Sequence, residues 1–167
     1  ADAVPPLVAL GAKVKLQSVD GERIFELSDF FIKPYKTKAT AKELLTEIQF
    51  QKLPDNARSV FIKLGRRNAL AISRLSVAAI VVLDDSKVIT EARSVPGATF
   101  PTWRRVAEAE HILLGEVPSV KLFEAAGKKV SEVMIAETGR RWSTEYKEPV
   151  IAVLVRRALE QCVANID

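Results

Sequence analysis

The chain has 167 residues, 48% of them hydrophobic and 28% charged, and its 25 basic and 21 acidic residues leave a formal net charge of +4. This length and composition are ordinary for a folded protein of one domain or two small ones, and the mild basic bias gives little reason to expect nucleic-acid binding. The chain has one histidine and one cysteine, Cys162, so it cannot form an internal disulfide or build a zinc or iron–sulfur centre alone. The single cysteine leads us to expect a reducing cytoplasm. We also expect no signal peptide and no membrane span.

The first predicted element is a short helix that begins near Asp2. The Asp2 carboxylate can cap the free backbone N–H groups, and Pro5 and Pro6 fit only the first turn of a helix. Gly11 follows as a natural left-handed stop. We therefore expect the helix to end just before Gly11.

A hairpin and a separate strand are predicted next. Residues 13–27 alternate between polar and apolar types, and Asp20-Gly21 suits a tight two-residue turn. Residues 28–42 show no period, so we expect an irregular loop there. Three aromatic side chains are expected to tether it, Phe30, Phe31 and Tyr35. Residues 43–50, ELLTEIQF, predict the further strand.

Residues 51–57 are a linker by composition, and three strands are predicted after it, at about 58–64, 74–84 and 88–95. The segment 74–84 is almost continuously apolar, so we expect a central strand that is buried on both faces. The segment 88–95 alternates better, and we expect it to face water on one side.

The last part of the chain predicts three helices. Thr102 can cap the first, which runs to Leu114, and Ser119 after Pro118 opens the second. Pro149 is expected in the first turn of the third, because a proline deeper in a helix removes a backbone hydrogen bond. Apolar residues recur every three or four positions in the second and third helices. The predicted fold class is α+β, with a three- to four-stranded antiparallel sheet packed on one face by about three helices.

A search for chemistry in the residues themselves gives little. The seven glycines are scattered, so no phosphate-binding glycine pattern is present. His111 lies in a predicted helix and Cys162 in an apolar helical stripe, where a structural role is expected for each. Glu108 and Glu110 are two positions apart on a helix and face away from each other, so they do not form an acid/base pair. We expect no catalytic residue in this chain.

Arginine occurs in four adjacent pairs, Arg66-Arg67, Arg104-Arg105, Arg140-Arg141 and Arg156-Arg157. The simpler interpretation is solvated surface. The alternative is that their forked donors anchor a phosphate or the carboxylates of a partner. Duplex binding is the weakest alternative, because no aromatic stacking platform or recognition helix accompanies the charge.

Five segments follow one another along the chain, DAVPPLVALGA, KELLTEIQF, FIKLGRRNALAIS, SVPGATFPTWRRVAEAEHILLG and RRWSTEYKEPVIAVLVRRALEQ. In this order and spacing they resemble the C-terminal portion of the FAD-binding (medium) subunit of the molybdenum hydroxylase family, the xanthine dehydrogenase and carbon monoxide dehydrogenase flavoproteins. Trp103 departs from the pattern, because the family often has a second proline there.

The resemblance implies two parts. Residues 1–54 would be the C-terminal part of the FAD-binding domain, a remnant of its α/β subdomain, and residues 58–167 a C-terminal domain like that of the CO dehydrogenase flavoprotein. Asp2 falls on the last position of the family motif Asn-x-Ser-Pro-x-x-Asp. We therefore expect a fragment of a subunit of roughly 280–300 residues, with weak or no FAD binding of its own.

The resemblance also implies three flavin contacts. Asp2 would accept hydrogen bonds from flavin hydroxyl or amine groups, with helix capping as the alternative. Leu45 would pack against the flavin ring, with ordinary core packing as the alternative. Lys63 would place a cation near the flavin, a role that Arg66 or Arg67 could share.

The implied function belongs to a complex. A molybdopterin subunit oxidises the substrate, an iron–sulfur subunit passes electrons to FAD, and FAD reduces NAD or another acceptor. This chain would form part of the flavin-site wall, together with the N-terminal part of the same flavoprotein and next to the iron–sulfur subunit. It would be a component of an oxidoreductase that is inactive as the isolated chain. The alternative is a non-catalytic assembly or interaction domain.

Overall fold

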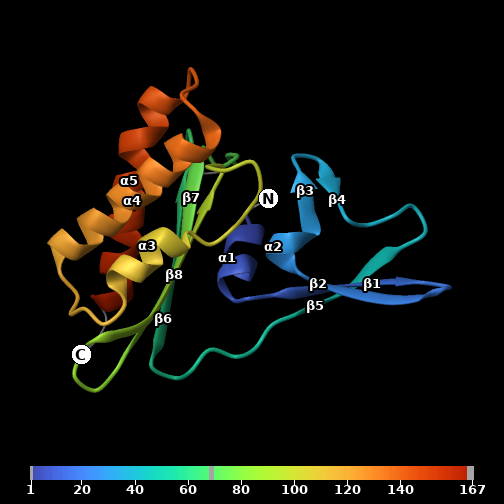
Figure 1. Ribbon diagram of the computed structural model, residues 1–167, viewed down its shortest axis with the longest axis horizontal. Helices are drawn as coiled ribbons and strands as arrows, with labels where there is room; N and C mark the ends of the chain where they lie inside the picture. Colours follow the sequence, from blue (N-terminus) through green and yellow to red (C-terminus); the bar gives the residue numbers. More distant parts are fainter. Residues whose placement is uncertain (1, 68–69, 165–167) are drawn as a thin grey trace.

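The computed structural model of the protein describes residues 2–67 and 70–164 (Figure 1). Outside the described residues lie Ala1, the last three residues of the predicted C-terminal domain, and Asn68 and Ala69 of the segment FIKLGRRNALAIS. The described chain holds five helices and eight strands, and every strand pairing is antiparallel. The predicted α+β class is therefore confirmed.

A three-stranded sheet forms the centre of the molecule. Its order is β6 (Ala57–Leu64), β7 (Leu75–Leu83) and β8 (Ile89–Gly97), so β7 is the middle strand. All nine residues of β7 are buried, because its side chains alternate between two cores. The predicted central strand buried on both faces is confirmed.

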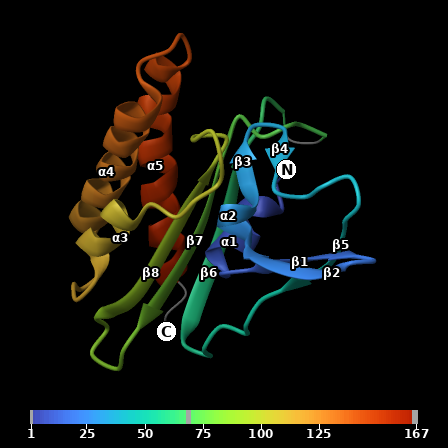
Figure 2. The same ribbon diagram turned by 45° about the vertical axis from the view of Figure 1, so that its right-hand side comes forward.

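Three helices cover one face of this sheet, as predicted, and Figure 2 shows them on the same side. They are α3 (Ala107–Leu113), α4 (Val120–Thr138) and α5 (Thr144–Val163). We call this sheet with these helices the body. The helix α4 begins directly after Ser119, as predicted, and the Ser119 hydroxyl caps it by accepting the backbone N–H of Leu122 at 3.2 Å. The first core lies between these helices and the sheet.

The helices α4 and α5 cross in close contact at Gly127. A Cβ atom on this residue would lie 2.3 Å from the carbonyl oxygen of Ala152. Only glycine allows this approach, which explains a residue that otherwise weakens a helix interior.

Two predicted helix starts are wrong. Thr102 caps nothing, because α3 begins five residues later at Ala107, after a segment that runs along β8 and donates Val106 N–H to Ser94 O at 3.0 Å. Pro149 lies inside α5 and not in its first turn, because the helix begins at Thr144.

A short helix, α1 (Val4–Ala9), covers the opposite face of the same sheet. Pro5 lies in its first turn as predicted, and Gly11 follows its end with φ +65°. A Cβ atom at Gly97 of β8 would meet Pro5 at 3.0 Å, so the helix sits directly on the strand. The end of β8 is therefore buried, and the prediction that this strand faces water on one side is wrong for its C-terminal half.

The second sheet is the arm, with strand order β2-β1-β5. It consists of β1 (Lys13–Ser18), β2 (Gly21–Glu26) and β5 (Leu44–Gln49). The predicted hairpin is present, although its two-residue turn is Val19-Asp20, one position earlier than expected. The arm extends away from the body in Figure 1.

The segment predicted to be irregular contains short elements, α2 (Leu27–Phe30), β3 (Phe31–Lys33) and β4 (Lys36–Thr37). Phe30 is buried, and the Phe31 ring packs 4.6 Å from the ring of Trp103. The expected aromatic tether therefore holds for these two residues. It is wrong for Tyr35, whose side chain is fully exposed.

Candidate functional site

A small polar cluster joins the start of the chain to the central sheet. Lys63 Nζ, at the end of β6, lies 2.6 Å from Asp2 Oδ2, and Ser73 Oγ, just before β7, lies 2.5 Å from Asp2 Oδ1. The antiparallel pairing of β6 with β7 brings Lys63 and Ser73 to the same end of the sheet. These residues are 61 and 71 positions from Asp2, so only the fold brings them together.

The cluster keeps Asp2 ionised. Hydrogen bonds from Lys63 and then from Ser73 lower the pKa of the Asp2 carboxyl, because they stabilise the charged form. Its side chain is 39% exposed and that of Lys63 38%, so both remain accessible to a ligand. Asp2 does not cap α1, whose N-cap residue is Ala3 and carries no side-chain cap. The capping alternative is therefore wrong.

A shallow hollow of about 320 Å³ adjoins the cluster. Asp2 and the segment 70–73 line it, and there the side chains of Leu70 and Ile72 are 94% and 93% exposed. The hollow therefore presents charged and apolar surface side by side.

Leu45 lies elsewhere. It is on β5 of the arm, opposite Leu16 of β1, and its side chain is 46% exposed. It therefore does not pack in the interior, which speaks against ordinary core packing. The structure brings two of the three predicted contacts together, Asp2 and Lys63, and no described contact joins Leu45 to them.

A groove of about 610 Å³ separates the arm from the body. Its lining includes residues 49–54, Lys13 and Glu26 of the arm, and Arg93 and Arg105 of β8 and its following segment. Each cation in it faces a carboxylate of the same chain, in the pairs Lys13–Glu26, Lys52–Asp55, Arg93–Glu91 and Arg105–Glu110. The groove therefore carries no unbalanced positive charge that would attract a phosphate.

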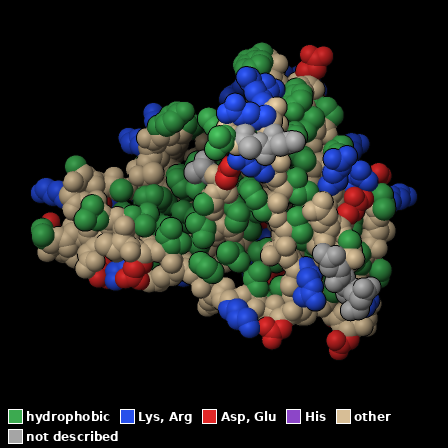
Figure 3. Space-filling view, turned by 180° about the vertical axis from the view of Figure 1, so that it is seen from behind, with side chains coloured by type: hydrophobic (Ala, Val, Ile, Leu, Met, Phe, Trp, Pro, Cys, Tyr) green, Lys and Arg blue, Asp and Glu red, His purple; other side chains and the backbone are tan. Residues whose placement is uncertain are grey.

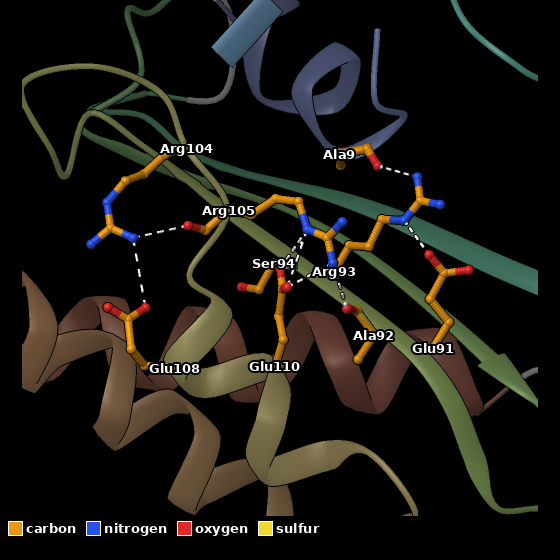
Figure 4. A network of polar contacts seen from close by, with 9 residues as sticks. All are labelled: Ala9, Glu91, Ala92, Arg93, Ser94, Arg104, Arg105, Glu108 and Glu110. Atoms are coloured by element: carbon orange, nitrogen blue, oxygen red, sulfur yellow. Dashed lines mark hydrogen bonds and ion pairs between the residues drawn. The ribbon is translucent and has the colours of Figure 1, made fainter. Parts of the chain in front are cut away.

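Figure 4 shows how the deepest of these pairs is built. Glu110 of α3 is only 4% exposed, and its carboxylate accepts Ser94 N–H at 2.8 Å and both Nε and Nη2 of Arg105. This contact raises the pKa of the Arg105 guanidinium. Arg93 reaches the other way and donates to Ala9 O at 2.8 Å. The network ties α3 and α1 to β8, so its role is structural.

Glu108 and Glu110 act separately, as predicted, because Glu108 contacts Arg104 and Glu110 contacts Arg105. Arg104 forms a second internal ion pair, and one arginine of each of two further pairs also does so. Arg104 reaches Glu137, Arg140 reaches Glu148, and Arg156 reaches Glu160. Neither interpretation from the sequence anticipated that carboxylates of this same chain hold Arg104, Arg105, Arg140 and Arg156.

The remaining chemistry-bearing residues are structural or isolated. Cys162 is buried, and burial raises the pKa of its thiol to about 12, so it is the inert core thiol that was expected. His111 is exposed in the last turn of α3. Within residues 2–67 and 70–164, no group of three or more histidine, cysteine or carboxylate residues could hold a metal ion. None of the helices in that part of the chain is both long and apolar enough to cross a membrane.

Ser73 is the one cluster member that sequence reasoning missed. A lone serine after a basic loop gives no chemical signal. Its role depends on the strand pairing that sets Lys63 beside it, which a one-dimensional pattern does not show.

The chain matches two family models. The CO dehydrogenase flavoprotein C-terminal domain matches residues 60–162, and the FAD binding domain in molybdopterin dehydrogenase matches residues 1–52. Among curated proteins, the chain is 29% identical to the nicotine 6-hydroxylase medium subunit of Paenarthrobacter nicotinovorans, over 95% of this chain and 55% of that protein. It is 30% identical to the nicotinate dehydrogenase FAD-subunit of Eubacterium barkeri, over 99% of this chain and 57% of that protein.

Solved structures share the fold. A carbon monoxide dehydrogenase from Hydrogenophaga pseudoflava superposes with a TM-score of 0.87 at 22% identity, covering 98% of this chain and 56% of that chain. Quinoline 2-oxidoreductase from Pseudomonas putida 86 superposes with a TM-score of 0.86 at 19% identity and the same coverage. The chain thus spans about half the length of the relatives it matches.

Proposed function

The chain belongs to the CO dehydrogenase flavoprotein family, which includes FAD-binding medium subunits of molybdenum hydroxylases, and on this basis we propose that it forms one wall of a flavin site. The observation that carries the proposal is the ion pair between Asp2 and Lys63. Asp2 lies in the part that matches the FAD-binding model, and Lys63 in the part that matches the C-terminal model. This accessible polar cluster therefore holds a residue from each of the two parts.

The residues present fit one side of a flavin. Asp2 is ionised and can accept hydrogen bonds from hydroxyl or amine groups, and Lys63 supplies a cation beside it. The chain offers no phosphate-binding site for the FAD pyrophosphate, because its sequence has no glycine-rich loop and the cations of the large groove already pair with carboxylates. We therefore propose that this chain alone binds FAD weakly or not at all.

Each residue has a distinct role in the proposal. Asp2 orients the ligand through its carboxylate, and Ser73 holds that carboxylate in place by its hydrogen bond. Lys63 favours negative charge on a neighbouring ligand. Leu45 is half exposed on the arm and offers apolar area to a ring system. It would contact the same ligand as Asp2 and Lys63 only if that ligand lies between the arm and the cluster. The division of the chain into residues 1–54 and 58–167 belongs to the same proposal, with the model matches at 1–52 and 60–162 as its support.

In the complete complex, we propose that bound FAD carries electrons from an iron–sulfur subunit to NAD or another acceptor, with the molybdenum centre in a further subunit. The relatives support this partnership, because they are medium chains or FAD subunits of larger enzymes. A reducing cytoplasm as the location is supported by the free thiol of the single cysteine.

The test uses two proteins, the chain alone and a chimera in which it replaces the matching residues of the nicotinate dehydrogenase FAD-subunit. FAD titration followed by flavin fluorescence should show no saturation in the micromolar range for the chain alone. The chimera should bind FAD, and Lys63→Met should weaken that binding roughly tenfold, which corresponds to about 1.4 kcal/mol.

Lys121→Met, on the surface of α4, is the matched control and should leave the FAD affinity of the chimera unchanged. Micromolar binding by the chain alone would contradict its role as a single wall. Equal affinities for the Lys63→Met chimera and its control would remove Lys63 from the site.

A further inference from the structure

We propose that a hollow beside the start of α5 binds the phosphate group of a small phosphate ester. The hollow has a volume of about 460 Å³, and Thr99, Met134 and Lys147 are among the residues that line it. It lies on the helical face of the body, whereas Asp2 precedes α1 on the opposite face of the sheet. The hollow is therefore a different site from the proposed flavin contact.

The ends of three elements meet around the hollow. Strand β8 ends at Gly97, α4 ends at Thr138, and α5 begins at Thr144. Figure 2 shows the turn between α4 and α5 at the same end of the body as the end of β8. Two hydrogen bonds fix this turn, because Arg141 N–H donates to Thr144 Oγ1 at 2.8 Å and Thr144 N–H donates to Arg141 O at 2.9 Å. The backbone of Arg141 is thus held against the first turn of α5.

The charged residues of the lining are both cations. They are Arg141 and Lys147, and no carboxylate lines the hollow among the described residues. In the same part of the chain neither cation forms an ion pair, since Arg141 Nε donates to Thr138 O at 3.1 Å and Lys147 Nζ donates to Ala98 O at 2.6 Å. The groove between arm and body differs, because each of its cations faces a carboxylate. The hollow thus carries two positive charges that no described carboxylate balances.

Both cations keep donors for a ligand. An ammonium group has three N–H donors and a guanidinium has five. The contacts with the carbonyl oxygens of Ala98 and Thr138 use one donor of each cation. The remaining N–H groups of Arg141 and Lys147 can therefore bind an anion without breaking a contact of the fold.

The positive charge of Lys147 is unfavourable where it stands. Burial, and then the cation of Arg141, lower the pKa of the Lys147 ammonium. Lys147 also lies at the end of the first turn of α5, where the helix dipole repels a cation. A bound anion would offset the repulsion from Arg141 and from the helix end.

A phosphate monoester matches this lining better than a carboxylate does. Its phosphate group is close to a dianion at neutral pH, so it can balance both cations, whereas a carboxylate balances one. The Ser143 hydroxyl also lines the hollow and makes no capping hydrogen bond to α5, so it can add a donor. Phe100, Pro101 and Met134 add an apolar wall, and the volume is typical of pockets that take a small organic molecule.

The FAD pyrophosphate is not this ligand. Proteins hold a pyrophosphate within glycine-rich loops whose backbone N–H groups converge on it, and this sequence has no such loop. A terminal phosphate can be held by side-chain cations. Variants of Arg141 and Lys147 should therefore leave FAD binding by the chimera unchanged.

Amide NMR of the 167-residue chain tests the site with three probes at constant ionic strength, phenyl phosphate, inorganic phosphate and benzoate. Phenyl phosphate should shift the amides of residues 98–100 and 143–147 and saturate in the millimolar range, while the β7 amides stay unchanged. Inorganic phosphate should bind roughly threefold more weakly because it has no ring for the apolar wall, and benzoate roughly tenfold more weakly because it leaves one cation unbalanced.

Variants of neighbouring cations locate the binding. Arg141→Gln and Lys147→Met should each weaken phenyl phosphate binding roughly tenfold, since each removes a charged donor. Arg140→Gln is the matched control, because it removes the same charge at the next position, yet Arg140 pairs with Glu148 and does not line the hollow. Its affinity should stay unchanged. Lys147→Arg keeps the charge and should keep most of the affinity, which separates a lost ligand contact from a lost tie to Ala98 O.

Four results would overturn the proposal. Benzoate binding as tightly as phenyl phosphate would show that a dianion is not required, and inorganic phosphate binding as tightly would remove the ester. An equal loss of affinity in Arg140→Gln would assign the binding to overall positive charge. A lower midpoint of thermal unfolding in Lys147→Met, with no probe-induced shifts in the unsubstituted chain, would make Arg141 and Lys147 ties of the fold and no ligand site.

Discussion

The body and the arm differ in how far they bury their apolar residues. Every residue of β7 in the body is buried, and every residue of β5 in the arm is exposed, although both strands are rich in aliphatic side chains. The body has a helical layer on one face of its sheet and α1 on the other, whereas the arm has only a four-residue helix over part of one face. The body therefore closes its own core, and the arm leaves apolar side chains exposed (Figure 3).

Alanine substitutions of two phenylalanines, one in the body and one beside the arm, test this difference most directly. The substitution in the body has the largest effect on stability that we expect. Phe123 of α4 is 2% exposed in the body, and Phe50 beside β5 is 54% exposed. Phe123→Ala should lower the free energy of unfolding by about 4 kcal/mol, because it removes a buried ring and leaves a cavity. Phe50→Ala should lower it by less than about 0.5 kcal/mol. Chemical denaturation of the two variants compares them.

Equal losses in the free energy of unfolding for the two variants would contradict this difference between body and arm. An equally large effect of Phe50→Ala would mean that this side chain is buried in solution by self-association or by a rearranged arm. Repeating the measurement at several protein concentrations distinguishes these causes, because only self-association makes unfolding concentration-dependent.

The contact between α4 and α5 gives the next effect. Gly127→Ala gains about 1 kcal/mol of helix propensity but forces a Cβ atom against Ala152 O, and overpacking of this kind typically costs about 1–3 kcal/mol. We expect a net loss of stability of about 1 kcal/mol, seen as a lower midpoint of thermal unfolding. Lys128→Ala, at the next and exposed position, should change the midpoint little. A stabilised Gly127→Ala variant would show that the two helices can move apart, and the body would then be less tightly closed than its burial indicates.

The same contrast separates what sequence reasoning could predict from what it could not. The strands of the body follow from apolar runs with clear turns between them, and the central position of β7 follows from its unbroken hydrophobicity. The start of α3 does not, because the backbone hydrogen bond from Val106 N–H to Ser94 O of β8 precedes the helix, and no local pattern encodes this contact. The predicted place of Pro149 in the first turn was wrong for a related reason. The packing of α5 against α4 and the sheet outweighs the backbone hydrogen bond that a proline inside the helix removes.

The candidate site was predictable only in part. Family resemblance indicated Asp2 and Lys63, and the structure joins them by an ion pair. Periodicity and composition could not have paired residues 61 positions apart, nor could they have found Ser73. The exposure of Ile48 was equally hidden, because an apolar alternation predicts a half-buried strand without saying whether the chain provides the cover.

The smallest expected effect lies in the arm, where an ion pair and not a core holds a loop. Arg23 Nε and Nη2 each lie 2.7 Å from an oxygen of Glu43, and Thr40 N–H donates to the same carboxylate at 2.8 Å. The hydrogen bonds from Arg23, and then that from Thr40 N–H, lower the pKa of Glu43 from 4.5 to about 2. Because the pKa in the folded chain is below that of the unfolded chain, the stabilisation is present above about pH 4.5 and is lost as the pH falls toward 2.

An NMR titration of the Glu43 carboxyl carbon measures this directly and should give a midpoint near 2. Over the same interval the Arg23 side-chain signals should shift as the contact is released, while the β7 amides of the body stay unchanged. Glu43→Gln should remove the pH response of Arg23, and Glu124→Gln on the surface of α4 should leave it intact. A Glu43 midpoint near 4.5 would mean that Arg23 does not hold the loop in solution, and the other ion pairs of the arm, Lys13–Glu26, Lys15–Glu22 and Lys15–Glu47, would be its remaining polar contacts.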